Sequence, residues 1–135
     1  MNFFFDNNMP FKLARALAEV HAPEHKICHL RDKYRPDVDD VTWLTRLARE
    51  PDGPWLIVSG DLRISRNPVE QKAWLDFGHI IFFLADGWTT IMPNDQLWKF
   101  VKVFPKILEA AARARPGSGF IIPQSSLKLR PITLH

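Results

Sequence analysis

Several features are absent from this 135-residue sequence, and each absence excludes a class of protein. The single cysteine, Cys28, cannot form an intramolecular disulfide or a zinc site that needs two thiolates, so a buried, inert thiol is expected. No apolar run approaches the roughly 20 residues of a membrane-spanning helix. The first residues lack the basic and long apolar regions of a signal peptide. We therefore expect a cytoplasmic protein with no membrane association.

Nucleotide-binding and hydrolase motifs are absent too. The sequence contains no glycine-rich phosphate loop, no dinucleotide fingerprint and no Gly-x-Ser-x-Gly elbow, which excludes the protein classes that depend on them. The histidines do not indicate a zinc site, because Pro23 lies between His21 and His25 and prevents them from sharing one face of a helix. Any chemistry must therefore come from other residues.

The composition is rich in aromatic residues and uneven in charge. Ten phenylalanines and five tryptophans against one tyrosine predict an aromatic core, and exposed aromatic surface would allow a homodimer. Residues 96–135 hold seven lysines and arginines but a single acid, Glu109, whereas residues 1–95 are net acidic. The basic part either meets a polyanion or is a solvated face.

Unbroken apolar runs alternate with amphipathic segments along the whole chain, as expected for parallel strands buried on both faces and joined by helices. We predict one α/β domain over residues 1–135, a three-layer α/β/α sandwich with a mainly parallel five-stranded sheet. The expected strands are residues 2–5, 26–30, 55–58, 80–84 and 119–122. The expected helices are residues 10–20, a segment from Asp39 or Asp40 to Pro51, residues 67–78, and residues 94–115 with Pro105 kinking or dividing the last one. Residues 127–130 form an edge strand or an ordered tail.

Two of these strands end in an aspartate. Asp6 follows Phe3-Phe4-Phe5, and Asp61 follows Ile57-Val58-Ser59-Gly60. Ligands of open α/β sheets bind outside the carboxyl ends of the strands, and the first and third strands are commonly neighbours there. Two carboxylates that meet repel each other, and a divalent cation such as Mg²⁺ or Mn²⁺ keeps both ionised. The alternative is that both aspartates only cap turns.

Further polar residues are expected near the same edge. Asp39 and Asp40 begin a helix, where an acid serves as a cap or as a metal ligand. Asn67 and Glu70 begin the next helix as cap and first-turn acid. Arg63 and Arg66 are suited to binding a phosphate oxygen, or are simply solvated.

A basic stripe is expected on the last helix. At about 100° per residue, Lys99, Lys102, Lys106 and Arg113 fall on one side, opposite Leu97, Val101, Leu108 and Ala112. The stripe is either the wet face of an amphipathic helix or a guide for nucleic acid.

Three segments resemble a known family. Phe3-Phe4-Phe5-Asp6-Asn7-Asn8-Met9-Pro10 is similar to the opening of the PIN-like domains, and Asp40-Val41-Thr42-Trp43-Leu44 to their Asp-x-x-(Trp/Val)-Leu segment. Ile57-Val58-Ser59-Gly60-Asp61 resembles their apolar strand that ends in aspartate. Within this family, the Gly60-Asp61 pair and the following Asn67-Pro68-Val69-Glu70 make the sequence most similar to the VapC-type toxin branch. The resemblance covers about residues 2–85.

This resemblance implies a compact nuclease that cleaves RNA with Mg²⁺ or Mn²⁺, often as a toxin paired with a small antitoxin. Carried over, Asp6, Asp40 and Asp61 would hold the metal, while Arg63, Arg66, Lys99 and Lys102 would place RNA. Residues that could support the ligands are Asn7, where the family often has Glu, Asp39, Asn67 and Glu70. The alternatives are a PIN-like protein-binding module without turnover and, less well matched, a phospho-receiver-like domain, which needs a lysine after the fifth strand.

Overall fold

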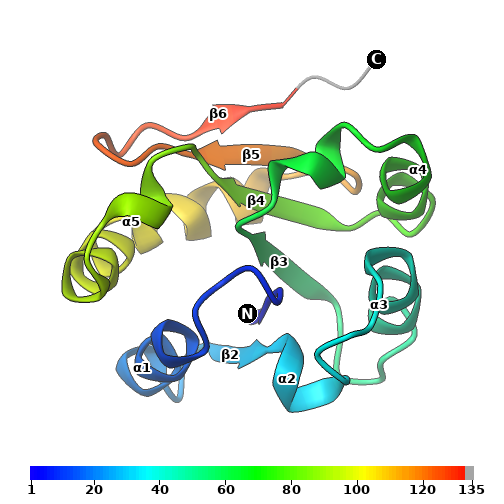
Figure 1. Cartoon of the computed structure of the whole chain (residues 1–135), viewed down its shortest axis with the longest axis horizontal. Coiled ribbons are helices and arrows are strands. Elements are labelled where there is room, and N and C mark those ends of the chain that lie inside the picture. Colours follow the sequence, from blue (N-terminus) through cyan, green and yellow to red (C-terminus); the bar gives the residue numbers. More distant parts are fainter. Residues whose placement is uncertain (133–135) are drawn as a thin grey trace.

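A computed structural model describes residues 1–132 and contains one mixed sheet with helices on both faces (Figure 1). Its strands are β1 (Asn2–Phe5), β2 (Lys26–His29), β3 (Trp55–Ser59), β4 (Ile80–Leu84), β5 (Gly119–Ile122) and β6 (Arg130–Pro131). The helices are α1 (Phe11–His21), α2 (Leu30–Lys33), α3 (Asp40–Leu47), α4 (Pro68–Asp76) and α5 (Pro93–Arg113), with 3₁₀ turns η1 (Leu62–Ser65) and η2 (Trp88–Thr90).

The strand order is β2-β1-β3-β4-β5-β6, and every pair is parallel except β5 with β6. The predicted α/β/α class and parallel order are confirmed. The sheet has six strands rather than five, because Arg130 and Pro131 add a short antiparallel edge strand, which begins at the last residue of the segment expected to form an edge strand or an ordered tail. β1 and β3 are neighbours, so the carboxyl ends of these two strands adjoin.

The N-terminal phenylalanine run explains the three layers. Successive side chains of a strand point to opposite faces, so Phe3 and Phe5 join one core while Phe4 joins the other. The first core packs against α1 and α5, and the second against α3 and α4, which Figure 1 shows on opposite sides of the sheet. All three phenylalanines are fully buried, which confirms a strand covered on both faces.

The buried faces of two helices differ from those that apolar spacing predicts. In the helix expected over residues 67–78, the spacing of Val69, Ala73 and Phe77 predicts the core face, but Val69 and Phe77 are exposed, and Trp74 lies in the core with Ala73. In α5 the core face is Phe100, Val103, Phe104 and Ile107, whereas Leu97, Val101 and Leu108 are only partly buried and Ala112 is exposed. The predicted faces were wrong because helical spacing alone does not say where a helix docks on the sheet.

Other differences are small. Pro105 lies inside α5, which runs without interruption from residue 93 to 113, so the helix is not divided in two. Leu30–Lys33 forms a short helix that was not expected, so the strand predicted over residues 26–30 ends at His29. Within residues 1–132 no helix is both long and apolar enough to cross a membrane.

Candidate active site

The carboxyl ends of β1 and β3 bring Asp6 and the Ser59-Gly60-Asp61 turn together. Phe5 is paired with Val58, and the Asp6 backbone N–H continues the ladder by donating to the Val58 carbonyl at 3.1 Å. The His29 ring lies 2.8 Å from the Met9 carbonyl, which ties the loop after Asp6 to β2. The chain therefore places the Asp6 carboxylate on a fixed backbone at this edge.

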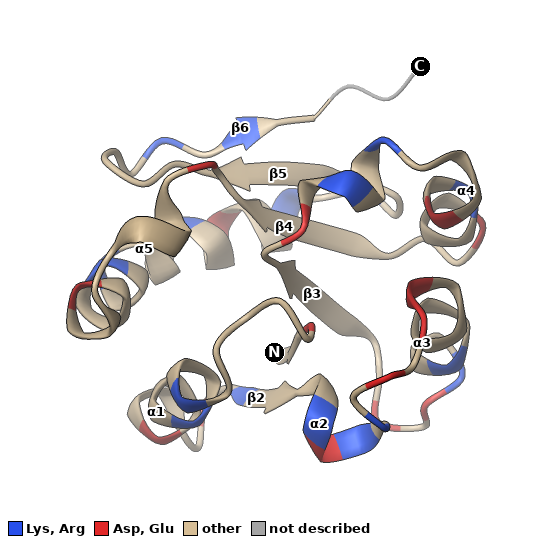
Figure 2. Cartoon of the chain, viewed as in Figure 1, with Lys and Arg blue, Asp and Glu red and all other residues tan. Residues whose placement is uncertain are grey.

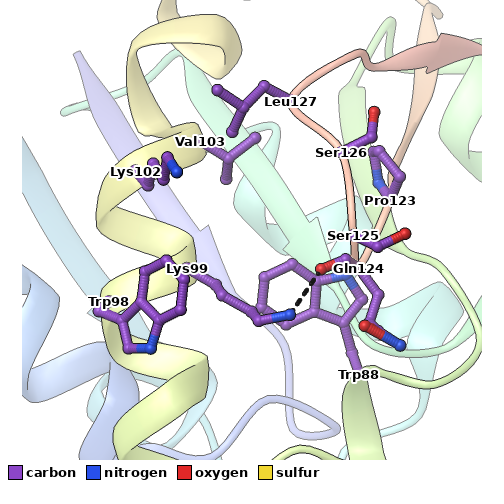
Figure 3. A pocket seen from close by; sticks show the side chains of 10 residues that line it. All are labelled: Trp88, Trp98, Lys99, Lys102, Val103, Pro123, Gln124, Ser125, Ser126 and Leu127. Atoms are coloured by element: carbon purple, nitrogen blue, oxygen red, sulfur yellow. Dashed lines mark hydrogen bonds between the residues drawn. The ribbon is translucent and has the colours of Figure 1, made fainter.

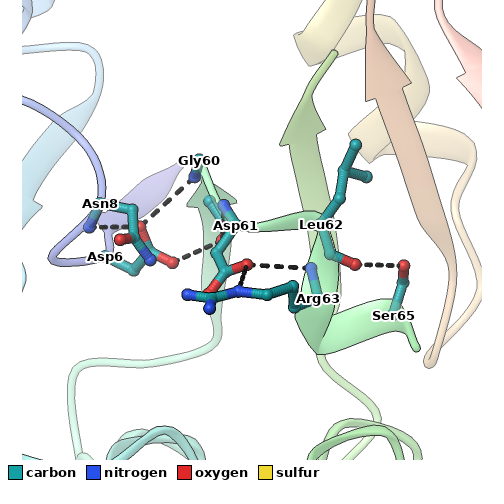
Figure 4. A network of polar contacts seen from close by, with 8 residues as sticks. Asp6, Asn8, Gly60, Asp61, Leu62, Arg63 and Ser65 are labelled. Atoms are coloured by element: carbon teal, nitrogen blue, oxygen red, sulfur yellow. Dashed lines mark hydrogen bonds and ion pairs between the residues drawn. The ribbon is translucent and has the colours of Figure 1, made fainter. Parts of the chain in front are cut away.

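The Asp6 carboxylate is buried and held by three donors (Figure 4). The Ser59 hydroxyl donates to one oxygen, and the backbone N–H groups of Asn8 and Gly60 donate to the other at 3.1 and 3.4 Å. Burial raises the pKa of Asp6 to about 7, although these hydrogen bonds act in the opposite direction and the Asp40 charge adds to the rise. Asp6 is thus a carboxyl group that changes charge near neutral pH.

Asp61 has a different environment, dominated by Arg63. The Arg63 guanidinium donates from Nε to Oδ1 at 2.9 Å and from Nη2 to Oδ2 at 3.0 Å, and its backbone N–H adds a third bond at 2.9 Å. The Arg63 side chain holds the pKa of Asp61 below its usual range. The Asp61 backbone N–H in turn donates to Ser59 Oγ at 3.0 Å, which links both acids through one serine.

Two more acids come from the starts of α3 and α4. Asp40 is the first residue of α3 and accepts a 2.8 Å hydrogen bond from Trp43 Nε1. Burial raises the pKa of Glu70, in the first turn of α4, to about 7, and the neighbouring Asp40 and then Asp61 add to the rise. In Figure 2 acidic positions stand at the start of α3, in α4 and just after β3. Four acids from separate parts of the chain therefore interact in one region, which we call the acid cluster: Asp6, Asp40, Asp61 and Glu70.

The fold and the acid cluster can now be compared with those of known protein families. A family model described as a PIN-like domain matches residues 1–86. The chain belongs to the PIN-like domain family. The match runs from β1 to just beyond β4 and contains all four members of the acid cluster. No curated protein and no solved structure matches the chain.

The predicted supporting and RNA-binding residues of this PIN-like domain do not all lie at the acid cluster. Asn7 donates to the Pro36 carbonyl at 3.2 Å, Asp39 caps α3 by accepting from the Thr42 N–H at 2.7 Å, and Asn67 caps α4. Arg63 and Arg66 are exposed. Lys99 and Lys102 lie on α5, outside the acid cluster.

The acid cluster fits a hard divalent cation in its chemistry but is not a preformed metal site. Carboxylate oxygens suit Mg²⁺ and Mn²⁺, and the Asp40 charge adds to the raised pKa of both Asp6 and Glu70, so negative charge is crowded here and a cation would neutralise it. Within residues 1–132, however, no three histidine, cysteine, aspartate or glutamate side chains are arranged to hold an ion. Arg63 already occupies both oxygens of Asp61.

Sequence reasoning missed the groups that hold Asp6 in place. Ser59 is fully buried and bonds both to Asp6 and to the Asp61 backbone, yet a serine before Gly-Asp carries no distinctive signal. Gly60 is tightly packed, since an added Cβ would lie 3.1 Å from the Asn8 carbonyl oxygen. The one available signal was the short Ser-Gly-Asp spacing after a buried strand, which predicts a tight turn.

Proposed function

We propose that this PIN-like protein is a metal-dependent endoribonuclease of the VapC type, which hydrolyses RNA phosphodiester bonds as the toxin of a toxin–antitoxin pair. The observation that carries the proposal is the convergence of four acids at the carboxyl edge of the sheet, with the pKa of both Asp6 and Glu70 raised to about 7. Perturbed carboxyl groups gathered at such an edge are typical of catalytic sites. Family membership makes phosphodiester hydrolysis the activity to test first.

Asp6, Asp40 and Asp61 are the proposed ligands of Mg²⁺ or Mn²⁺. A bound divalent cation would act as a Lewis acid, favouring the ionisation of water and neutralising charge on the phosphate. Ser59, Asn8 and Gly60 orient the Asp6 carboxylate and favour its ionised form. Glu70 interacts with Asp40 and would hold its carboxylate in place.

Arg63 would change partner when RNA binds. Its side chain is 84% exposed while that of Asp61 is 10% exposed, so the guanidinium reaches the site from solvent and can leave it without disturbing the core. Bidentate donors such as guanidinium suit phosphate as well as carboxylate. Arg63 would thus release Asp61 to the metal and bind the substrate phosphate, with Arg66 nearby as a second cation.

The test is RNA cleavage by purified protein with Mg²⁺ or Mn²⁺ against EDTA. Asp6→Asn is expected to abolish metal-stimulated cleavage while the protein stays folded, because it removes the charge but keeps the side-chain shape. Asp76→Asn is the matched control, since Asp76 is exposed on α4 and bonds only to Lys72 among the described residues. Full activity of Asp6→Asn would refute the assignment.

Expression in cells gives a second, independent readout. Growth arrest by the wild type, relieved by Asp61→Ala and by co-expression of a small antitoxin protein, is the expected result. Absence of arrest together with absence of cleavage in vitro would instead favour a PIN-like protein-binding module. Whether the toxin works as a homodimer stays a prediction.

A further inference from the structure

A small pocket lies between α5 and the segment that follows β5. Its volume is about 110 Å³, and Trp88 and Val103 line it together with polar groups from both sides. Figure 3 shows the Lys99 side chain reaching from α5 toward Gln124, with the Trp88 ring close by. Both Trp88 and Gln124 follow the carboxyl end of a strand, so the pocket opens at the same edge of the sheet as the acid cluster.

Two lysines at this pocket have no carboxylate partner within residues 1–132. Lys99 Nζ donates to the Gln124 carbonyl at 3.0 Å, which uses one of its three N–H groups, and Lys102 is exposed. Farther along α5, by contrast, Lys106 lies 3.5 Å from Glu109. A partly buried ammonium without a counter-ion favours an anionic ligand.

An exposed tryptophan stands beside these lysines. Trp98 is 51% exposed, and the Nζ atoms of Lys99 and Lys102 lie 5.9 and 5.7 Å from its ring centroid. The indole N–H donates to Asp95 at 3.1 Å, which fixes the ring without covering it. A half-exposed indole with two ammonium groups nearby offers a stacking surface for a base and partners for the adjacent phosphates.

A second cavity shares Trp88 with this pocket and reaches the backbone that holds Asp6. It has a volume of about 360 Å³, and its lining includes Asn8 and Gly60, whose backbone N–H groups bond to Asp6. The buried Trp88 indole donates to the Ile122 carbonyl at 3.0 Å, which fixes the ring that both cavities share. A strand that follows the two cavities would run from the backbone beside Asp6, past Trp88, to Trp98.

We infer that Trp98, Lys99 and Lys102 form a binding subsite for single-stranded RNA, in which an unpaired base stacks on Trp98 and its phosphates lie beside the two lysines. The inference rests on the proposed ribonuclease function and deepens it, because it adds a contact for the substrate strand on α5, outside the acid cluster. A base paired in a duplex has no free face to place on the indole. The strand would continue past Trp88 to the acid cluster, where cleavage takes place.

Binding can be measured apart from cleavage by fluorescence anisotropy in EDTA, with a labelled single-stranded RNA of about 12 nucleotides, within the range of common single-strand site sizes. Trp98→Ala is expected to weaken binding about 5- to 100-fold, as loss of one stacked base does. Lys102→Gln should weaken binding and reduce the slope of log affinity against log salt by about 0.7. The controls are Phe77→Ala, an exposed aromatic side chain by the amino ends of β3 and β4, and Lys106→Gln, whose charge is paired with Glu109.

The outcomes separate this inference from the proposed function. Wild-type affinity in Trp98→Ala would overturn the subsite, even if the acid cluster proves essential for cleavage. An equal loss of affinity for duplex RNA would overturn the assignment to unpaired RNA. Weakened single-strand binding in Trp98→Ala, in a protein that cuts no RNA with Mg²⁺ or Mn²⁺, would support the subsite and refute the ribonuclease.

Discussion

Replacing Asp6 by asparagine is expected to stabilise the metal-free protein at alkaline pH. Burial raises the pKa of this carboxyl group from 3.8 to about 7. Between these two pH values the folded protein keeps a proton that the unfolded chain has released. Raising the pH through this window therefore lowers the free energy of unfolding, and the loss is complete once the pH exceeds about 7.

The size of the effect follows from the two pKa values of Asp6. Each pH unit of difference corresponds to about 1.4 kcal/mol, so the ionised carboxylate costs the native state roughly 4 kcal/mol at pH 8. Asparagine has nearly the same shape and does not ionise, and its amide oxygen can still accept from the Asn8 and Gly60 N–H groups. A domain of this size is typically stable by about 5–15 kcal/mol, so the difference is large enough to measure.

The assay is urea unfolding of wild type and Asp6→Asn in EDTA, at pH values from 4 to 9. The variant should gain stability relative to wild type as the pH rises from 4 to 8, with most of the change complete by pH 8. Other titrating groups contribute to both proteins and largely cancel in the difference. A stability difference that does not vary with pH would refute the conclusion that Asp6 is a buried carboxyl group with a raised pKa.

Three further changes test the surroundings of the acid cluster. Ser59→Ala removes the hydroxyl that lowers the pKa of Asp6, so the pH-dependent loss of stability should extend to higher pH in the same urea assay; an unchanged profile would argue against this contact. Asn67→Ala removes the cap that accepts from the Val69 and Glu70 N–H groups and should cost about 1 kcal/mol of unfolding free energy, whereas no loss would contradict the capping role. Arg63→Gln removes the cation that holds down the pKa of Asp61, so NMR titration should give a higher pKa for Asp61; an unchanged value would mean that the ion pair does not form.

The fold was largely predictable because its strands have an unusual pattern. Phe3, Phe4 and Phe5 leave no polar face, and only a sheet covered on both sides can bury all three. Strict alternation of strands and helices then favours the parallel order. The resemblance was expected over about residues 2–85, and the family model matches residues 1–86.

The docking of α4 was beyond sequence reasoning, for a physical reason. Its buried face is set by Trp74, whose indole N–H donates to the His79 carbonyl at 2.7 Å. An added Cβ at Gly119 would lie 2.7 Å from the Trp74 ring, so the ring fits because Gly119 in β5 has no side chain. A contact between residues this far apart in the chain leaves no trace in the local spacing of apolar residues.

Parts of the site were hidden for a related reason. The sequence explains Glu70 as a first-turn acid of α4, and Asn67 does cap that helix, but only the fold brings the Glu70 side chain to Asp40. Ser59 likewise gains its role from the pairing of β1 with β3, which places it against Asp6. Asp6 and Asp61 were predictable because the end of a buried strand is a place where position alone indicates a role.

Metal binding by the acid cluster can be measured by a Mn²⁺ titration followed by electron paramagnetic resonance, with wild type and Asp6→Asn compared at pH 8. We expect a Mn²⁺ site in the wild type whose affinity falls about tenfold or more in Asp6→Asn, as the loss of a metal ligand or its support does, while Asp76→Asn binds as the wild type does. Equal Mn²⁺ affinity in wild type and Asp6→Asn, or no binding at all, would contradict the claim that the acids at the ends of β1 and β3 hold a divalent cation.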